Sequence, residues 1–428
     1  MSTLNDAADF RGRLNLALGA AAFTISSAGS VLLHIVLALA IYGETGSGLV
    51  TAIFVSLQWL PVFIVILYRS DWDFGMEPRK RWYLLDITSA LLTLLIIPFV
   101  WESNYIAIVL LLLLRGLFDH VSRITKTVIA PYIFPREKLS YYASFMQSGY
   151  HVGIAVAAVA GVFLVSSVSL EIAILFDAVT FLVSAALVYL IRNVSEEKFP
   201  ESGRRNPIGQ RCIDYFSSLK EDPRLFFCCM LPPLTAAFFQ GTYSVLQPIY
   251  PGEQFALDSS AVSASYVMAS VAIVLGSSAF ALFCKYSRIF ERDFSAVILV
   301  ALMGSLLACG SYMASVYTGS VVASAIFFTV MVFLFEFVWM LGYSGIVTLS
   351  PKNRVGSVFA ITFAIGCFLG SVTALVTGGL LDLFNNNFVY TVGIFMAVYS
   401  LLILASYALY RRWSYSVGSA QLSGASAG

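Results

Sequence analysis

The sequence predicts an all-α membrane protein whose twelve transmembrane helices form two six-helix bundles that repeat one another. Hydrophobic residues make up 59% of the 428 residues and charged residues only 11%, which excludes an ordinary water-soluble protein of this size. Apolar runs of about 20 residues, the length that crosses a bilayer, occur twelve times. A stripe of small residues also occurs twice, at Gly149 and again 217 positions later at Gly366, which indicates an internal repeat.

Six predicted spans fall in each half of the chain. They cover residues 15–42, 49–68, 82–101, 105–126, 142–165, 170–191, 226–249, 261–284, 294–314, 320–347, 356–381 and 388–410. Pro232 and Pro233 can break the seventh span near its start, because proline lacks the N–H that a helix interior uses.

The spans divide the chain into domains. We expect an amino-terminal bundle over residues 1–192, a cytoplasmic linker rich in charge, Pro and Gly over 193–224, and a carboxy-terminal bundle over 225–413. The small polar tail, residues 414–428, is expected to be disordered or an engineered remnant.

One span in each half carries small residues four positions apart, and residues at that spacing lie on one face of a helix. A face of Gly and Ala lets another backbone approach closely inside lipid. We therefore assign a helix-packing role to these glycines. They are Gly149, Gly153 and Gly161 in the first half and Gly366, Gly370 and Gly378 in the second.

Lys and Arg concentrate in alternate connecting segments, and the cytoplasmic side of a membrane protein retains these residues. With twelve spans and the amino terminus inside, the external loops contain no Lys or Arg and carry acidic residues instead. We therefore expect a multi-pass protein of the cell's inner (cytoplasmic) membrane with both termini cytoplasmic. The external acids are Glu44, Glu102, Glu171, Glu253, Asp258 and Asp382.

The chain shows no glycine-rich phosphate loop, no nucleophile beside a base and no metal-ligand spacing. We therefore expect no enzyme, no cofactor and no resident metal, and no basic stretch predicts nucleic-acid binding. The expected energy source is a proton gradient. The expected partners are protons, a small-molecule substrate and the lipid bilayer, with a monomer as the working unit.

Three segments carry a family resemblance: Ser30–Ser47 followed by Leu60–Pro61, then Pro131–Leu139, then Phe176–Ala185. With the six-plus-six spans and the long basic central loop, they resemble the major facilitator superfamily, in particular its branch of macrolide-efflux proteins and the enterobactin exporter. The resemblance implies the major facilitator fold and alternating access, with spans one, four, seven and ten lining a central cavity. The loop after span two lacks the family's leading glycine, and span five carries no Gly-Pro. The gate residues implied in and after that loop are Asp71, Asp73, Arg79 and Arg81.

Span four carries Arg115, Asp119, Arg123 and Lys126 at steps of four, four and three, which places them on one helical face. Charged side chains are costly in hydrocarbon unless they are paired or line a water-filled cavity. This face of span four therefore cannot be exposed to lipid. Two interpretations are open: an ion-pair ladder that locks span four to its neighbours, or a cavity face, as the resemblance implies. We favour the cavity, in which Arg115 and Arg123 attract an anionic or zwitterionic solute.

Glu336 lies inside span ten and maps by the repeat onto Asp119, or onto His120 with an offset one residue shorter. At 1.5 Å per residue, Asp119, Glu336 and Arg115 lie roughly 11, 16 and 17 Å from the inner ends of their spans, near mid-membrane. Glu336 has no basic neighbour on its own helix, so it is the better candidate to bind and release a proton, with Asp119 and His120 as further proton-coupling candidates. A buried acid that never exchanges its proton is the alternative.

Further polar and aromatic residues share faces of spans one, five, seven and ten. They predict a cavity with aromatic walls and amide groups, although each taken singly is also typical of packing. The substrate-binding candidates besides Arg115 and Arg123 are His34, Gln147, Tyr150, His151, Gln240, Tyr243, Gln247, Trp339 and Tyr343. Asp86 and Asp177, outside the cavity spans, are interpreted as helix-packing or gate acids.

The leading function is a secondary transporter that exports a medium-sized organic solute, such as a siderophore or a drug, in exchange for protons. Two alternatives stay open. The three histidines, His34, His120 and His151, all fall in predicted spans, and histidine ligates transition metals, so the substrate could be iron or another divalent metal ion. The altered gate loop also fits a scaffold or sensor that transports nothing.

Overall fold

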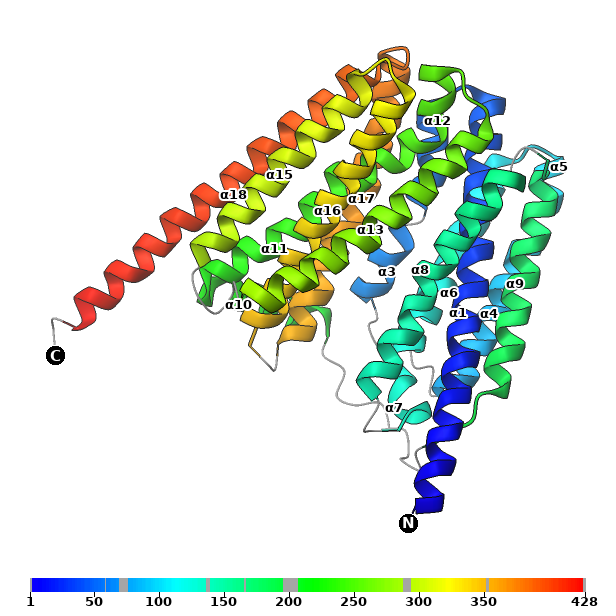
Figure 1. The fold of residues 1–428 in the computed structure, drawn as a ribbon, viewed down its shortest axis with the longest axis horizontal. Helices are drawn as coiled ribbons and strands as arrows, with labels where there is room; N and C mark the ends of the chain where they lie inside the picture. The colour runs from blue at the N-terminus through cyan, green and yellow to red at the C-terminus, as the bar shows by residue number, and fades with distance from the viewer. Residues whose placement is uncertain are drawn as a thin grey trace. The chain divides into compact units, whose positions relative to one another are not determined.

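The computed structural model describes residues 2–57, 59–68, 76–135, 139–164, 167–194, 207–287, 294–351 and 354–425, and within these ranges the regular structure is helical, with no strand (Figure 1). Eleven helical segments of this described part are long and apolar enough to cross a membrane. α8 (Leu139–Leu164), at the position of the fifth predicted span, contributes a shorter apolar stretch, Val152–Leu164. The predicted fold class, an all-α protein with many membrane-spanning helices, is confirmed.

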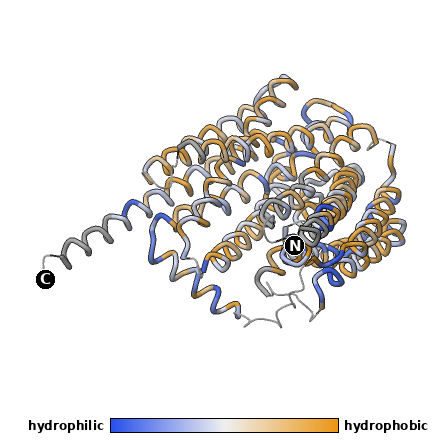
Figure 2. The backbone as a smooth tube through the Cα atoms, turned by 60° about the horizontal axis from the view of Figure 1, so that its bottom comes forward, coloured by the Kyte–Doolittle hydropathy of each residue, from blue (hydrophilic) through white to orange (hydrophobic). Residues whose placement is uncertain are grey.

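The helices follow the predicted apolar runs along the chain. Besides α8 they are α1 (Ser2–Thr45), α2 (Gly48–Ser56), α3 (Leu60–Tyr68), α4 (Pro78–Leu94), α5 (Ile97–Trp101), α6 (Tyr105–Val128), α7 (Ala130–Ile133), α9 (Leu170–Leu190), α10 (Ile208–Glu221), α11 (Pro223–Thr235), the π-helix η2 (Ala236–Gly241), α12 (Thr242–Phe255), α13 (Ser259–Ser287), α15 (Phe294–Tyr317), α16 (Val321–Leu349), α17 (Val355–Leu383) and α18 (Phe388–Ala425). Hydrophobic residues run along these helices, and hydrophilic residues concentrate at helix ends and in connections (Figure 2).

Proline interrupts two of the predicted spans. Pro61 is the second residue of α3; it cannot donate to the carbonyl of Leu57, and its ring would clash there, so α2 and α3 are separate helices. Pro98 acts in the same way on the carbonyl of Leu94, the last residue of α4. Each predicted span, 49–68 and 82–101, still corresponds to one candidate membrane span, Gly48–Val65 and Pro78–Trp101, and each is built from two helices.

The seventh span behaves differently. α11 continues through Pro232 and Pro233, and the Ala236 N–H then donates to the carbonyls of both prolines. The π-helix η2 follows and leads directly into α12. The possible break at the proline pair does not occur: both prolines lie inside α11, and the wider π-helical turns of η2 begin only at Ala236.

Two expected irregular segments contain helix. The predicted linker over 193–224 includes α10, whose exposed residues Ile213 and Phe216 flank a buried Tyr215. The tail beyond residue 413 continues α18 as far as Ala425.

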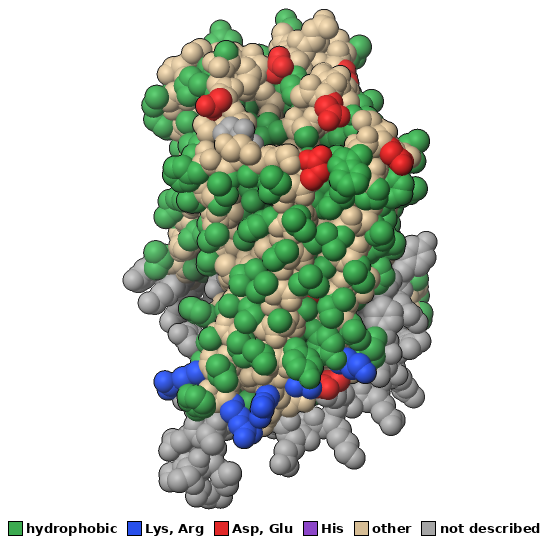
Figure 3. Space-filling view, turned by 90° about the vertical axis from the view of Figure 1, so that its right-hand side faces the viewer, with side chains coloured by type: hydrophobic (Ala, Val, Ile, Leu, Met, Phe, Trp, Pro, Cys, Tyr) green, Lys and Arg blue, Asp and Glu red, His purple; other side chains and the backbone are tan. Residues whose placement is uncertain are grey.

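Packing groups the chain into two compact units. Unit 1 comprises Met1–Gly46, Leu60–Arg205 and Ala256–Ser270, and unit 2 comprises Ser47–Trp59, Asn206–Phe255 and Val271–Gly428. Unit 2 thus includes α2, from the first half of the sequence, and unit 1 includes the start of α13, from the second half. On the face shown in Figure 3, Lys and Arg gather at one end, and Asp and Glu lie mostly at the other.

In unit 1 the glycine stripe of α8 lies against α1. A Cβ atom on Gly153 would lie 1.9 Å from Ser27 Oγ and 2.4 Å from the Thr24 carbonyl oxygen, so no other residue fits at this approach. A Cβ on Gly149 would lie 2.8 Å from the carbonyl of Ala20, and one on Gly161 would lie 2.7 Å from Ser263 Oγ of α13. The backbones of α1 and α8 therefore pack as closely as small residues allow.

In unit 2 the equivalent stripe lies on α17. A Cβ on Gly378 would lie 2.4 Å from the carbonyl oxygen of Gly48 in α2. Gly366 and Gly370 have more room, since their added Cβ atoms would lie 3.5 Å from Pro233 Cα and 3.7 Å from the Ala236 carbonyl oxygen. The stripe of α17 thus faces α11, η2 and α2.

Candidate functional site

Arg115 of α6 binds Asp177 of α9 inside unit 1. Its Nη2 lies 2.5 Å from Asp177 Oδ2 and donates to Ser30 Oγ at 2.8 Å, while Nε donates to Thr93 Oγ1 at 3.0 Å. The guanidinium also lies 5.2 Å from the centre of the Phe181 ring. The Asp177 side chain is fully buried and that of Arg115 is 11% exposed, so this network joins α6 to α1, α4 and α9.

Asp119 and Arg123 form a second, more accessible pair one turn further along α6. Arg123 Nη2 lies 3.0 Å from Asp119 Oδ2, and its Nε donates to the same oxygen at 3.1 Å. The guanidinium lies 4.4 Å above the ring of Tyr150 on α8, which is favourable for a cation. The Arg123 side chain is 28% exposed and the Asp119 side chain 12%. The charged face of α6 thus divides into a buried pair and a partly open pair.

Lys126 completes the charged face and is almost fully buried. Its Nζ lies 4.4 Å from the ring centre of Phe23, 5.4 Å from that of Trp82 and 3.4 Å from Ser26 Oγ. Two aromatic faces and one hydroxyl therefore surround this ammonium group.

Asp86 of α4 is fully buried and accepts three hydrogen bonds. Its donors are Trp82 Nε1 at 3.1 Å, Ser122 Oγ at 2.8 Å and Ser184 Oγ at 2.6 Å. Asp86 connects α4, α6 and α9, as the packing interpretation of this acid expects.

Glu336, on α16 in unit 2, lies against α13. Ser277 Oγ donates to Glu336 Oε1 at 2.8 Å, and a Cβ on the neighbouring Gly276 would lie 3.0 Å from Glu336 Cβ. Within the described ranges, Ser277 is the only hydrogen-bonding partner of Glu336, and no Lys or Arg forms an ion pair with it. Glu336 therefore differs from Asp119 and Asp177, each of which has an arginine.

Trp339 and Tyr343 follow Glu336 on α16 but pack on α17 instead of α13. Their rings lie 6.3 Å from Phe363 and 5.0 Å from Phe359, respectively. Glu336 and these two aromatic candidates therefore contact different neighbouring helices.

The polar candidates of the seventh span lie on η2 and α12. Tyr243 is buried between the rings of Phe328 and Phe335, at 6.0 and 6.4 Å. Gln247 is also buried, and its Nε2 has no hydrogen-bond partner among the described residues. Gln240, on η2, is half-buried. An unpartnered buried amide is costly, so Gln247 is a group that a bound solute or water would satisfy.

The remaining candidates are described only in part. His34 and His120 are half-buried on α1 and α6, whereas the side chains of Gln147 and His151 lie outside the description. Among the described residues, no three His, Cys, Asp or Glu side chains come together in a way that could hold a metal ion.

Two of the four predicted gate residues lie within the described part of the chain and two do not. Asp71 and Asp73 lie outside the described residues. Arg79 Nη1 donates to the carbonyl of Ile191 at 2.8 Å, and the buried Arg81 donates through Nε to Thr125 Oγ1 at 3.0 Å. Both arginines therefore donate to other residues of unit 1.

The partner of Arg115 is the main feature that sequence reasoning missed. Asp177 was expected to be a packing or gate acid, with no arginine assigned to it. The available signal was its position inside the apolar run of α9, because an acid at membrane depth needs a compensating group.

The chain matches the sequence model of the Major Facilitator Superfamily over residues 14–374. It is similar in structure to a bacterial homolog of the human lysosomal transporter Spinster (12% identity, TM-score 0.69, covering 95% of this chain and 97% of that chain). It is also similar to a POT family transporter in complex with a thioalcohol-conjugated peptide (12%, TM-score 0.70, covering 92% and 96%), and to the nucleoside transporter NupG (14%, TM-score 0.66, covering 93% and 99%). At these identities the likeness shows the fold alone. No curated protein sequence matches the chain.

Proposed function

Because this chain belongs to the major facilitator superfamily, whose members are secondary transporters that work by alternating access and not enzymes, we propose that it exports a medium-sized anionic or zwitterionic organic solute in exchange for protons. The observation that carries the proposal is the environment of Glu336. This acid lies inside a membrane-spanning helix, and among the described residues its partner is a serine hydroxyl and no cation is paired with it. A carboxyl group so placed can gain or lose a proton without breaking an ion pair.

The proposed solute site includes Arg123, Asp119 and Tyr150. Their partly open arrangement supports this role, because a guanidinium that retains some exposure can bind a carboxylate or a catecholate oxygen. The Tyr150 ring beside it adds an aromatic surface. Within unit 2, considered by itself, Gln247 is proposed to donate to a solute or to water, because its amide nitrogen has no hydrogen-bond partner among the described residues.

Arg115 is proposed to position α6 and not to bind the solute directly. Its Nε and Nη2 already donate to Thr93, Ser30 and Asp177, which leaves only Nη1 for a further acceptor. The contacts therefore favour Arg123 over Arg115 as the solute-attracting arginine.

Export and the solute class rest on the sequence resemblance to macrolide-efflux proteins and the enterobactin exporter. A catecholate siderophore and a macrolide are therefore the first probes.

The test is transport by the purified chain in proteoliposomes with an imposed pH gradient. Uphill movement of the active probe is expected for the unchanged protein and for Glu102→Gln, a matched change in an exposed acid. Glu336→Gln is expected to lose uphill movement while keeping exchange of labelled for unlabelled probe, because a neutral amide cannot carry a proton.

If Glu336→Gln transports uphill as well as the unchanged protein, proton coupling through Glu336 is wrong. If no probe moves under any gradient and a stable protein partner is recovered instead, the scaffold interpretation is favoured over transport.

A further inference from the structure

The linker helix α10 has three sides of different chemistry. Successive residues turn by about 100° around a helix, which sorts the residues of α10 by side. The buried side carries Arg211, Tyr215, Ser218 and Leu219. The polar side carries Gln210, Asp214, Ser217 and Glu221, and an outer side carries the exposed residues Gly209, Ile213, Phe216 and Lys220. The packing of unit 2 covers the buried side and leaves the outer side open.

The buried side fixes the depth of α10. This helix packs on α11 and α17, where Tyr215 is hydrogen-bonded to Thr362 and interacts electrostatically with Cys229. The candidate membrane spans of these two helices begin at Pro223 and Val355. At 1.5 Å per residue, both contacts of Tyr215 lie roughly 10 Å beyond the first residue of a span. The buried side of α10 therefore contacts the spans inside their ends.

The polar side of α10 lies at the very edge of the spans. Ser217 and Glu221 accept hydrogen bonds from Arg354 Nη1 at 3.0 and 2.8 Å, and Arg354 is the N-cap residue of α17. On the same side, Gln210 Nε2 donates to Asp214 Oδ1 at 3.0 Å. The polar and buried sides together place α10 across the level at which unit 2 enters the membrane.

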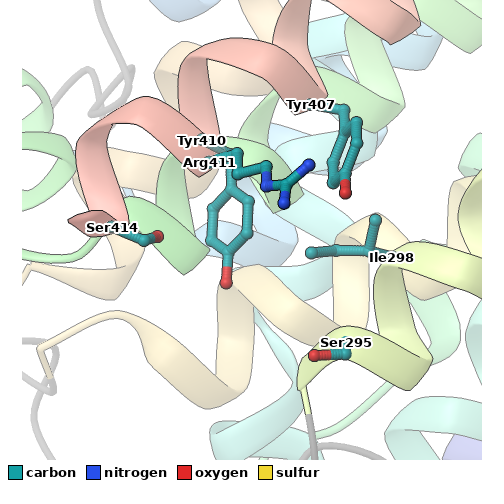
Figure 4. Close-up of a pocket in the computed structure, with 6 residues that line it drawn as sticks. All are labelled: Ser295, Ile298, Tyr407, Tyr410, Arg411 and Ser414. Carbon is teal, nitrogen blue, oxygen red and sulfur yellow. The ribbon is translucent and has the colours of Figure 1, made fainter.

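Aromatic side chains mark the same level in the neighbouring helices. Tyr410 of α18 packs on Phe227 of α11 and Phe294 of α15, with ring centres 6.0 and 5.5 Å apart. Figure 4 shows Tyr407 and Tyr410 projecting from α18 toward α15. Phe294 is the first residue of its candidate span. Rings with one polar edge favour the membrane boundary, because one part is apolar and the other is wet.

The outer side of α10 combines apolar and basic character. Ile213 and Phe216 are 61% and 59% exposed, and Lys220 follows Phe216 after one helical turn. The acids of α10, Asp214 and Glu221, both lie on the polar side. A helix at a bilayer surface buries apolar side chains just below the headgroups and holds Lys at the level of the phosphates. The residues of the outer side match this arrangement.

We propose that the outer side of α10 inserts into the headgroup region of the lipid bilayer. Ile213 and Phe216 then lie among the first acyl carbons, and Lys220 lies beside anionic headgroups. In this arrangement α10 ties the start of α11 to the membrane surface. The proposal does not depend on which solute is transported or in which direction.

The test is photo-crosslinking of the purified full chain in nanodiscs of phosphatidylethanolamine and phosphatidylglycerol, with p-benzoylphenylalanine introduced at one position at a time. The test positions are Ile213 and Phe216. Gln210, exposed on the polar side of the same helix, is the matched control. Irradiation is expected to add the mass of one phospholipid at either test position, and this adduct should be lost when the probe is at position 210.

Lys220→Ala tests the basic part of the outer side. With the probe at position 216, this change should lower the ratio of phosphatidylglycerol to phosphatidylethanolamine adducts about fivefold, the effect of one basic residue at an anionic surface. An unchanged ratio would overturn the role of Lys220.

Four outcomes of the crosslinking would overturn the insertion itself. Adducts to another peptide of this chain would mean that the outer side packs within the protein, and adducts to a second protein would make it a partner surface. No adduct at either test position would leave this side in water. Equal lipid adducts at positions 210, 213 and 216 would mean that no side of α10 is selected.

Discussion

Individual buried charges in unit 1 are compensated by several kinds of neighbour. Arg115 has a carboxylate, Lys126 has two aromatic faces, and Asp86 has three neutral donors. Lys126 and Asp86 also attract each other electrostatically. Leaving any of these charges alone in an apolar interior would be costly. The fourth span therefore carries both structural charges and, at Arg123 and Asp119, a pair that remains accessible.

Removing the acid partner of Arg115 should destabilise the protein. Asp177→Ala leaves a buried guanidinium without its counter-charge, for which the expected loss is about 3–5 kcal/mol. Equilibrium unfolding in mixed detergent micelles measures the loss. Ser30→Ala, which removes one neutral acceptor from the same arginine, is the control and should cost about 1 kcal/mol.

The double variant Arg115→Met/Asp177→Leu separates structure from solute binding. Replacing both charges with apolar groups of similar size should recover most of the stability. Retained transport in this double variant would agree with a positioning role for Arg115. Lost transport at normal stability would contradict that role and favour direct solute binding.

At the level of helices, prolines decide where spans are interrupted and glycines decide where helices approach most closely. The break before Pro61 separates α2 from α3, which allows α2 to group with unit 2 while α3 groups with unit 1. Because Gly378 approaches Gly48 closely, α2 packs directly against α17.

Two adjacent glycines of α17 test this packing. A Cβ on Gly378 would lie 2.4 Å from the Gly48 carbonyl oxygen and 2.6 Å from Ala52 Cβ, whereas one on Gly379 would have nothing within 4 Å. Gly378→Ala should therefore cost about 1–3 kcal/mol by forcing the helices apart. Gly379→Ala should be neutral or slightly stabilising, since alanine favours a helix over glycine. Thermal unfolding of both variants in detergent distinguishes them, and equal melting temperatures would refute the close-packing account.

Across the whole molecule, the chain passes from unit 1 to unit 2 within a very short segment between α1 and α2. Gly46 adopts a positive φ of 61°, a conformation that glycine accepts without strain. The next residues are held by Asp382 at the far end of α17, whose carboxylate accepts from Ser47 Oγ at 2.7 Å, Gly48 N at 2.6 Å and Leu49 N at 3.2 Å. The start of α2 is therefore anchored in unit 2 by a single acid.

Replacing this acid should loosen the start of α2. Asp382→Ala leaves two amides at a helix amino terminus without their acceptor, which costs about 1 kcal/mol. Hydrogen exchange of the peptide covering Gly48–Val50 should accelerate about fivefold, the factor that corresponds to this energy. Asp258→Ala removes a similar cap from Ser260 at the start of α13 and should leave that peptide unchanged. Unchanged exchange in Asp382→Ala would show that the Gly378 contact alone holds α2.

The sequence by itself determined that this chain is a helical membrane protein, where its spans lie and which faces carry small or charged residues. Helix period, span length and residue type are local properties, so one sequence suffices for them. Only the tertiary structure decided that Arg115 pairs with Asp177, 62 residues away, that Arg123 keeps some exposure, and that Glu336 faces Ser277 while Trp339 and Tyr343 face α17. These outcomes depend on how each helix is rotated and which neighbour it packs against, because a periodic pattern specifies a face of a helix without specifying what that face contacts.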